Sequence, residues 1–212
     1  MSNIDYDYNY LFKTILLGDA GYGKTSFVNK ILNNKTTEKH EPTIGLEFAS
    51  YIVKLEDKKF KLHIWDTAGQ ECFAPIIKTY YKNVSCALIF LDVTDENSFK
   101  NAEKWYQRYE DNKTPGSNSN PIFICNKIDV KDRKFTTQEG INFASHYGCK
   151  YYEISAKTGE NCDNILPMFT KHIYQNMNKN FYIEEPGIRK NVLLKLTNTK
   201  GKEWRSSCCY IS

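Results

Sequence analysis

A glycine-rich segment near the N-terminus carries the strongest chemical signal in the chain. Residues 18–25 run Gly-Asp-Ala-Gly-Tyr-Gly-Lys-Thr and match the pattern GxxxxGK followed by Ser or Thr. Glycines let backbone N–H groups wrap phosphate oxygens, and a helix that begins here adds the positive end of its dipole. Lys24 is placed to reach the β- and γ-phosphates, and the Thr25 hydroxyl to ligate Mg²⁺. The predicted phosphate-binding residues are Gly18, Asp19, Ala20, Gly21, Tyr22, Gly23, Lys24, Thr25 and Ser26.

A second polar segment, Asp66 to Gln70, follows an apolar run that ends at Trp65. A carboxylate at the end of a strand, beside a phosphate-binding loop, is placed to hold Mg²⁺ through water. Gly69 offers an unhindered backbone N–H to the γ-phosphate. Gln70 is placed to orient an attacking water, because an amide donates and accepts at once. Without the glycine-rich segment, Gln70 would be an ordinary solvated loop residue.

Two further polar segments, residues 126–129 and 155–157, each follow an apolar run. The edge of guanine presents two neighbouring donors, which one carboxylate accepts together and which adenine does not offer. Asp129 is therefore predicted to select guanine over adenine. The segment Asn-Lys-Ile-Asp is a weak signal alone and becomes strong because it follows the first two motifs in order. The predicted base-binding residues are Asn126, Lys127, Asp129, Ser155, Ala156 and Lys157.

Strand-like apolar runs alternate with helical patterns along the chain. The expected strands are residues 10–17, 46–55, 60–65, 87–91, 122–125 and 151–154, and the expected helices are residues 25–32, 96–109, 137–147 and 165–173. The second and third strands, joined by a polar turn, predict an antiparallel hairpin. The alternation predicts an α/β fold with a mostly parallel six-stranded sheet flanked by helices on both faces, and the glycine-rich motif adds that it is of the P-loop class. Such a sheet binds its ligand at the carboxyl ends of its strands, where every motif above falls.

The length and the charge distribution of the chain predict its domain organisation. Its 212 residues suffice for one domain with a substantial core, and no apolar run is long enough to span a membrane. Residues 1–170 hold 21 Lys and Arg against 22 Asp and Glu, a net charge of −1, whereas residues 171–212 hold 8 against 3, a net charge of +5. We expect an N-terminal extension at 1–9, a domain at 10–176, and a flexible basic tail at 177–212. One interpretation is that the basic tail binds an acidic surface, most simply a membrane leaflet. The other is that the tail is basic only to remain soluble, and composition alone does not separate the two.

The seven cysteines lack the spacing of a zinc site or a disulfide framework. Cys86 and Cys125 lie inside apolar runs, where a small buried thiol is the ordinary outcome. A reduced, cytoplasmic protein is expected.

Together these motifs resemble those of the Ras-superfamily small GTPases, and of the Rab family in particular. The Rab-like segments are residues 44–48, 61–71 and 80–82, and the similarity runs from about Tyr10 to Asn176. The resemblance implies a molecular switch that binds GTP and GDP with Mg²⁺ and hydrolyses GTP. It implies loops, around 36–48 and 66–81, that order and disorder with nucleotide state. It assigns catalysis to Gln70 and Lys24, and Mg²⁺ ligation to Thr25, Thr43 and Asp66.

The resemblance also implies partners and a location. These are an exchange factor, a GTPase-activating protein, effectors, a prenyl-binding escort and a membrane reached through the tail, with no nucleic acid and a monomeric state. No obvious arginine finger is supplied in cis, so an activating partner is expected to provide one. The protein is expected on the cytoplasmic face of endomembranes, cycling with the cytosol, in vesicular trafficking.

The chain ends in Cys208-Cys209-Tyr210-Ile211-Ser212. Two adjacent cysteines after a basic tail fit the double geranylgeranylation of Rab proteins, and two lipids anchor stably where one is marginal. The same residues also fit a CaaX box in which Cys209 alone carries a farnesyl group.

Three positions depart from the family pattern. Thr36 stands where an aromatic residue usually lies against guanine, which predicts looser binding and faster exchange. Cys72 stands where arginine usually follows Glu71, which puts activator contacts in doubt, and Ala20 replaces a serine common in Rabs. Three alternatives stay open: a farnesylated signalling GTPase of the Ras type, a module that binds nucleotide with little turnover, and an adenine-specific P-loop kinase, which Asp129 opposes.

Overall fold

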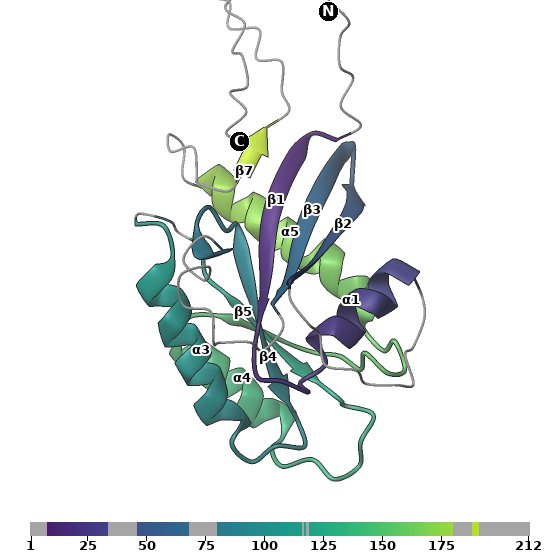
Figure 1. Ribbon diagram of the computed structural model, residues 1–212, viewed down its shortest axis with the longest axis vertical. Coiled ribbons are helices and arrows are strands. Elements are labelled where there is room, and N and C mark those ends of the chain that lie inside the picture. The colour runs from purple at the N-terminus through teal and green to yellow at the C-terminus, as the bar shows by residue number, and fades with distance from the viewer. Residues whose placement is uncertain are drawn as a thin grey trace, which may run out of the picture.

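The computed structural model describes residues 8–33, 46–67, 80–115, 117, 119–179 and 188–190. In that part of the chain, helices cover both faces of a seven-stranded sheet (Figure 1). The strands are β1 (Tyr10–Leu17), β2 (Leu46–Leu55), β3 (Lys58–Thr67), β4 (Cys86–Asp92), β5 (Ile122–Asn126), β6 (Lys150–Glu153) and β7 (Ile188–Lys190). The helices are α1 (Lys24–Asn33), α3 (Ser98–Asn112), α4 (Thr137–His146) and α5 (Cys162–Lys179).

Six of the strands follow the order β2-β3-β1-β4-β5-β6. Neighbours on this path are parallel except β2 and β3, which form the predicted antiparallel hairpin. The predicted α/β fold with a mostly parallel six-stranded sheet is therefore confirmed. The hairpin turn is tighter than predicted, because Leu55 already pairs with Lys58. Glu56 adopts a φ of 54°, the left-handed conformation that a two-residue turn requires.

Each face of the sheet has its own hydrophobic core. Along β1, Phe12 and Leu16 join the core shared with α1 and α5, whereas Ile15 and Leu17 join the core shared with α3. This alternation follows from the strand geometry, in which successive side chains point to opposite faces. All residues of β4 and β5 are buried, as their continuous apolar runs predict. A sheet packed on both faces holds the carboxyl ends of its strands at fixed positions.

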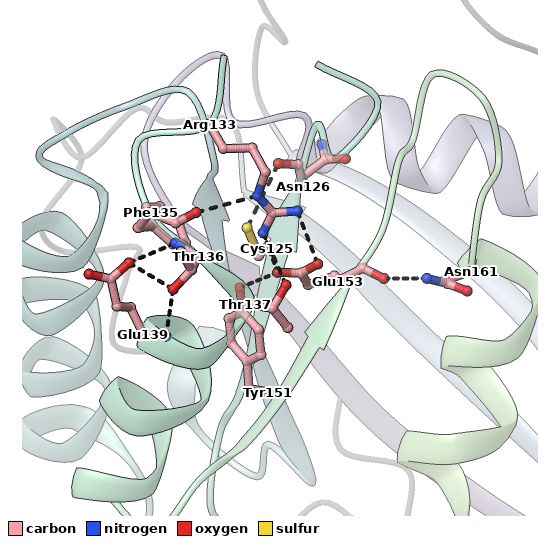
Figure 2. Close-up of polar contacts among 10 residues, drawn as sticks. All are labelled: Cys125, Asn126, Arg133, Phe135, Thr136, Thr137, Glu139, Tyr151, Glu153 and Asn161. Carbon is pink, nitrogen blue, oxygen red and sulfur yellow. Dashed lines mark hydrogen bonds and ion pairs between the residues drawn. The ribbon is translucent and has the colours of Figure 1, made fainter. Parts of the chain in front are cut away.

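Helix α4 begins with a capping box (Figure 2). The Thr136 hydroxyl accepts from the Glu139 backbone N–H at 3.2 Å, and the Glu139 carboxylate accepts from the Thr136 N–H at 2.7 Å. The hydrogen bonds from the Thr136 backbone and then from its hydroxyl lower the pKa of Glu139. The cap fixes the start of α4 next to the loop that follows β5.

The C-terminal segment differs from the predicted flexible tail at two places. Helix α5 continues to Lys179, three residues past the expected domain end at 176, and residues 188–190 form β7. Strand β7 pairs antiparallel with Tyr10 to Phe12 of β1. The pairing is possible because β4 begins opposite Thr14, so that its ladder leaves the first residues of β1 open to another strand. In the described part of the chain, no helix combines the length and apolar character needed to cross a membrane.

Gly140 in α4 generates a prediction about stability. A Cβ atom there would lie 2.2 Å from Cζ of Tyr151, whose hydroxyl donates to Glu153 at 2.9 Å. Overpacking of this kind costs about 1–3 kcal/mol, against a gain of about 1 kcal/mol from helix propensity. We expect Gly140→Ala to lower the free energy of unfolding by about 1 kcal/mol, measured by urea denaturation. The control is Ser145→Ala, at an exposed position of the same helix, which should change it by less than about 0.5 kcal/mol. A Gly140→Ala protein as stable as the wild type would mean that the Tyr151 ring shifts freely.

Candidate functional site

Four polar segments meet at one edge of the sheet. They follow or end β1, β3, β5 and β6, which run parallel, so that their carboxyl ends share this edge. In Figure 1 the chain leaves the lower end of β1, passes through the glycine-rich loop and enters α1. The predicted site residues within the described ranges are therefore brought to one edge.

The glycine-rich loop has a conformation that its glycines make possible. Gly18, Gly21 and Gly23 have φ angles of 135°, 79° and 87°, all in the region that favours glycine. A Cβ atom on Gly23 would also lie 2.2 Å from the side-chain nitrogen of Asn126. The loop thus turns sharply and approaches the segment after β5 closely.

Lys24 lies inside this loop. Its ammonium group donates to the backbone carbonyls of Gly18 at 2.6 Å and Asp19 at 2.9 Å, and the residue is only 5% exposed. The loop therefore folds around a buried positive charge. Together with the N-terminus of α1, which begins at Lys24, this charge makes the loop attractive to an anion.

Thr25 and Asp66 bring two oxygens together beside the loop. The Thr25 hydroxyl donates to the Asp66 carboxylate at 2.5 Å, and Asp66 is 1% exposed. Asp66 lies within β3, opposite Leu16 of β1, rather than just after the strand as predicted. A hydroxyl and a carboxylate are hard oxygen donors of the type that Mg²⁺ prefers, so these residues fit the expected ion.

Asn126 links the loop to the opposite side of the site. Its side-chain nitrogen donates to the Tyr22 carbonyl at 2.9 Å, and its side-chain oxygen accepts from the Ala156 N–H at 2.9 Å. The residue is almost fully buried. One amide thus joins the glycine-rich loop, the end of β5 and the loop after β6.

The Asp129 carboxylate is held in place by Ser155. The Ser155 hydroxyl donates to Asp129 at 2.6 Å and accepts from the Thr158 N–H at 3.0 Å. Asp129 is half-buried, whereas Lys157, in the same loop as Ser155, is exposed. Lys127 adopts a φ of 67°, and its ammonium pairs with the buried Asp92 at 2.5 Å.

Arg133 and Glu153 form an ion pair next to the loops that carry Asp129 and Ser155 (Figure 2). The guanidinium reaches both carboxylate oxygens, at 2.6 and 3.3 Å, and also donates to the Phe135 carbonyl at 3.3 Å. Tyr151 donates to the same carboxylate, and Asn161 donates to the Glu153 carbonyl, both at 2.9 Å. Burial alone would raise the pKa of Glu153, but the hydrogen bonds from Arg133 and Tyr151 outweigh it and hold the pKa below its usual range.

Sequence reasoning missed this network. Arg133 lies four residues after Asp129, and Glu153 lies two residues before Ser155. The pair therefore anchors the two loops that were predicted to hold a base. The available signal was Glu153 itself, a charged residue inside a short strand-like run.

A surface aromatic cluster next to the site consists of Phe48 on β2, His63 and Trp65 on β3, and Tyr80, which precedes β4. Phe48 is 50% exposed, and its ring packs edge-on against those of His63, at 4.8 Å, and Trp65, at 5.0 Å. The rings of Trp65 and Tyr80 are 6.2 Å apart. Phe48 is the exposed member of this cluster, since His63, Trp65 and Tyr80 are half-buried and Trp65 also packs against the core shared with α3.

Several predicted residues lie outside the described part of the chain. They are Thr36, Thr43, Gly69, Gln70, Cys72, Cys208 and Cys209. Among the described residues, no group of three His, Cys, Asp or Glu side chains could hold a metal ion. Thr25 and Asp66 do not need a third protein carboxylate, thiolate or imidazole, because phosphate oxygens would supply further ligands to the expected Mg²⁺ ion.

Comparison with known proteins places the chain in a family. Residues 13–175 match the model of the Ras family. The chain is 36% identical to the Ras-related protein RABE1d of Arabidopsis thaliana, over 96% of this chain and 94% of that protein. It is 34% identical to the Ras-related protein RAB1BV of Beta vulgaris, over 96% and 94% of the two chains. It is also 34% identical to the Ras-related protein Rab-2B of Dictyostelium discoideum, over 87% and 88%. The chain therefore belongs to the Ras family of small GTPases, on its Rab branch.

Proposed function

We propose that this protein is a Rab-like switch that binds GTP or GDP with Mg²⁺, hydrolyses GTP, and acts from a membrane in vesicular trafficking. The observation that carries the proposal is the pairing of two loops across Asn126. The loop around Lys24 suits phosphates, and the loop that carries Asp129 suits a base. One ligand that has both parts, a nucleotide, is what such a site would bind.

Base selection is assigned to Asp129. Guanine offers two adjacent donors, N1–H and the exocyclic amine, to one carboxylate. The hydrogen bond from Ser155, at 2.6 Å, fixes the carboxylate in one orientation before a base arrives. Adenine would present a different pattern and leave a half-buried carboxylate poorly paired, so GTP should bind far more tightly than ATP.

Phosphate chemistry is assigned to the glycine-rich loop and the residues beside it. The loop N–H groups and the Lys24 ammonium would bind the β- and γ-phosphates, and Thr25 and Asp66, with Thr43, would hold Mg²⁺. The ion would neutralise charge that develops on the phosphates. Gln70 would orient the water for in-line attack on the γ-phosphate. A partner is expected to supply an arginine, which makes unassisted hydrolysis slow.

The aromatic cluster supports the proposed partners. Phe48 and Tyr80 belong to segments 36–48 and 66–81, which are proposed to change with nucleotide state, and the Trp65 ring contacts both. An effector that binds the exposed Phe48 ring would respond to the bound nucleotide. Exchange factors and activating proteins would contact the same region, and an escort protein would bind the prenylated tail.

The function is tested with purified full-length protein and Mg²⁺, by measuring binding of GTP and ATP and then phosphate release. We expect GTP to bind at least about 100-fold more tightly than ATP, because only guanine pairs with Asp129. Gln70→Leu should slow phosphate release by about tenfold or more and leave GTP binding intact. The control is Gln138→Leu, which changes an exposed glutamine of α4.

Each other outcome has a clear meaning. Equal binding of ATP and GTP would contradict the role of Asp129 and with it the proposed function. Selective GTP binding without phosphate release from the wild type would favour the module with little turnover.

The Arg133–Glu153 pair generates a second prediction. Arg133→Gln should weaken GDP binding by about three- to tenfold, because the loops of Asp129 and Ser155 lose a shared anchor. Arg133→Lys should recover part of the loss, since it keeps the charge without the two-pronged geometry. The matched control is Lys113→Gln, which removes the 2.7 Å ion pair between Lys113 and Glu110. The side chains of that pair are about as exposed as those of Arg133 and Glu153. Equal GDP affinity in Arg133→Gln and the wild type, by fluorescence titration, would rule out the anchoring role.

Membrane attachment is proposed through Cys208 and Cys209. Two geranylgeranyl groups are expected from the Rab relationship, and one farnesyl group on Cys209 would indicate a signalling GTPase of the Ras type. The mass of the C-terminal peptide from protein made in eukaryotic cells distinguishes the two. An unmodified peptide would contradict lipid anchoring altogether.

A further inference from the structure

Helix α3 and the turn before it contact the glycine-rich loop at three points. Trp105 donates from its indole N–H to the Asp19 carboxylate at 2.7 Å. The Tyr22 hydroxyl donates to the Asp95 carboxylate and accepts from the Asn101 side chain at 3.1 Å. These bonds join residues 73 to 86 positions apart in sequence. Two residues of the loop, Asp19 and Tyr22, are therefore held from outside by α3 and the turn before it.

The α3 side of these contacts is itself fixed. Asn101 and Trp105 are four residues apart, so they lie on one face of the helix. Asp95 lies in the turn between β4 and α3, and its other carboxylate oxygen accepts from the Asn97 N–H at 2.9 Å. The Asp95 carbonyl accepts from the Ser98 N–H at 3.1 Å, which ties the turn to the first residue of the helix. The groups that meet the loop thus stand on a packed helix and a hydrogen-bonded turn.

On the loop side, the contacts reach residues next to the predicted phosphate ligands. Tyr22 is 5% exposed, although its neighbours Ala20 and Gly21 are exposed. Its carbonyl accepts from Asn126, so its backbone and its side chain are both engaged. Asp19 accepts from Trp105 through its side chain, while its carbonyl accepts from Lys24. A change in either contact would move the backbone that is expected to wrap the phosphates.

A loop with three left-handed glycines has little regular structure to hold its shape. Its N–H groups bind phosphate well only if they already point inward when the nucleotide arrives, because ordering the loop on binding would cost free energy. Side chains that bond to the outer surface of such a loop supply this preorganisation. The contacts from α3 and the turn before it are of this kind, because they reach the loop from outside and leave its inner surface, where Lys24 lies, to the phosphates.

We propose that Asp95, Asn101 and Trp105 are positioning residues that hold the glycine-rich loop in its phosphate-binding shape and thereby slow the release of nucleotide. The inference rests on the proposed function, in which this loop binds GTP and GDP. It assigns to α3 a second role besides packing against the sheet. Loss of a contact would increase the rate of nucleotide dissociation.

The test measures release of a fluorescent GDP from full-length protein, with Mg²⁺ and excess unlabelled GDP, together with the melting temperature of each variant. Tyr22→Phe removes the hydroxyl that meets Asp95 and Asn101, and Trp105→Phe removes the donor to Asp19. Each should speed release by about three- to tenfold. Asp95→Asn, which keeps an acceptor, should release more slowly than Asp95→Ala.

The matched control is Tyr109→Phe. Tyr109 belongs to α3 and is fully buried, and its hydroxyl contacts Ser119 rather than the glycine-rich loop. This control should lose stability comparably and keep the wild-type release rate within about twofold. If Tyr22→Phe and Trp105→Phe release GDP no faster than Tyr109→Phe, the contacts are structural only and the inference is wrong. A wild-type protein that fails to retain GDP would instead overturn the proposed function, and this inference with it.

Discussion

The side chain of Asn126 is the contact on which the arrangement of the site depends. It donates to the Tyr22 carbonyl and accepts from the Ala156 N–H, each at 2.9 Å, in a position closed to solvent. Removal of this amide would leave a buried carbonyl and a buried N–H without their partner, at about 1–3 kcal/mol each. No other residue type of similar size supplies a donor and an acceptor in this geometry. One side chain therefore connects the glycine-rich loop directly to the loop after β6.

Around this bridge, each loop has a separate anchor on a different helix or strand. The glycine-rich loop is held by α3 through Trp105 and by the turn before α3 through Asp95. The loops that carry Asp129 and Ser155 are held by the ion pair of Arg133 with Glu153, the last residue of β6. These anchors do not share residues, so disturbance of one loop need not spread directly to the other. Asn126 joins the two sides directly, and the ion pair of Lys127 with Asp92 gives a second link, because the Asp95 N–H donates to the Asp92 carbonyl.

Sequence reasoning succeeded where a local pattern carries the information. The buried strands β4 and β5 are continuous apolar runs, and Lys24 belongs to a motif of fixed spacing, so both were predictable. The anchors were not, because each is a pair of ordinary residues from distant segments. Tyr22 and Asp95 are 73 positions apart, and no local pattern says which carboxylate a tyrosine will meet. The base-binding role of Asn126 stays a prediction, whereas its bonds to two backbone groups could not be predicted, because they join residues 104 and 30 positions apart.

Strand β7 was unpredictable for a different reason, and it bears on where the proposed membrane anchor is attached to the domain. Residues 188–190 carry no alternating apolar pattern, and their pairing follows from the place that the late start of β4 leaves beside Tyr10 to Phe12. The site follows the other end of β1, about 25 Å away along an eight-residue strand. Because β7 runs antiparallel to β1, its last residue, Lys190, lies beside Tyr10, at the end of the sheet opposite the site. If the tail is lipidated as proposed, its anchor is tethered to the end of the sheet opposite the proposed nucleotide edge.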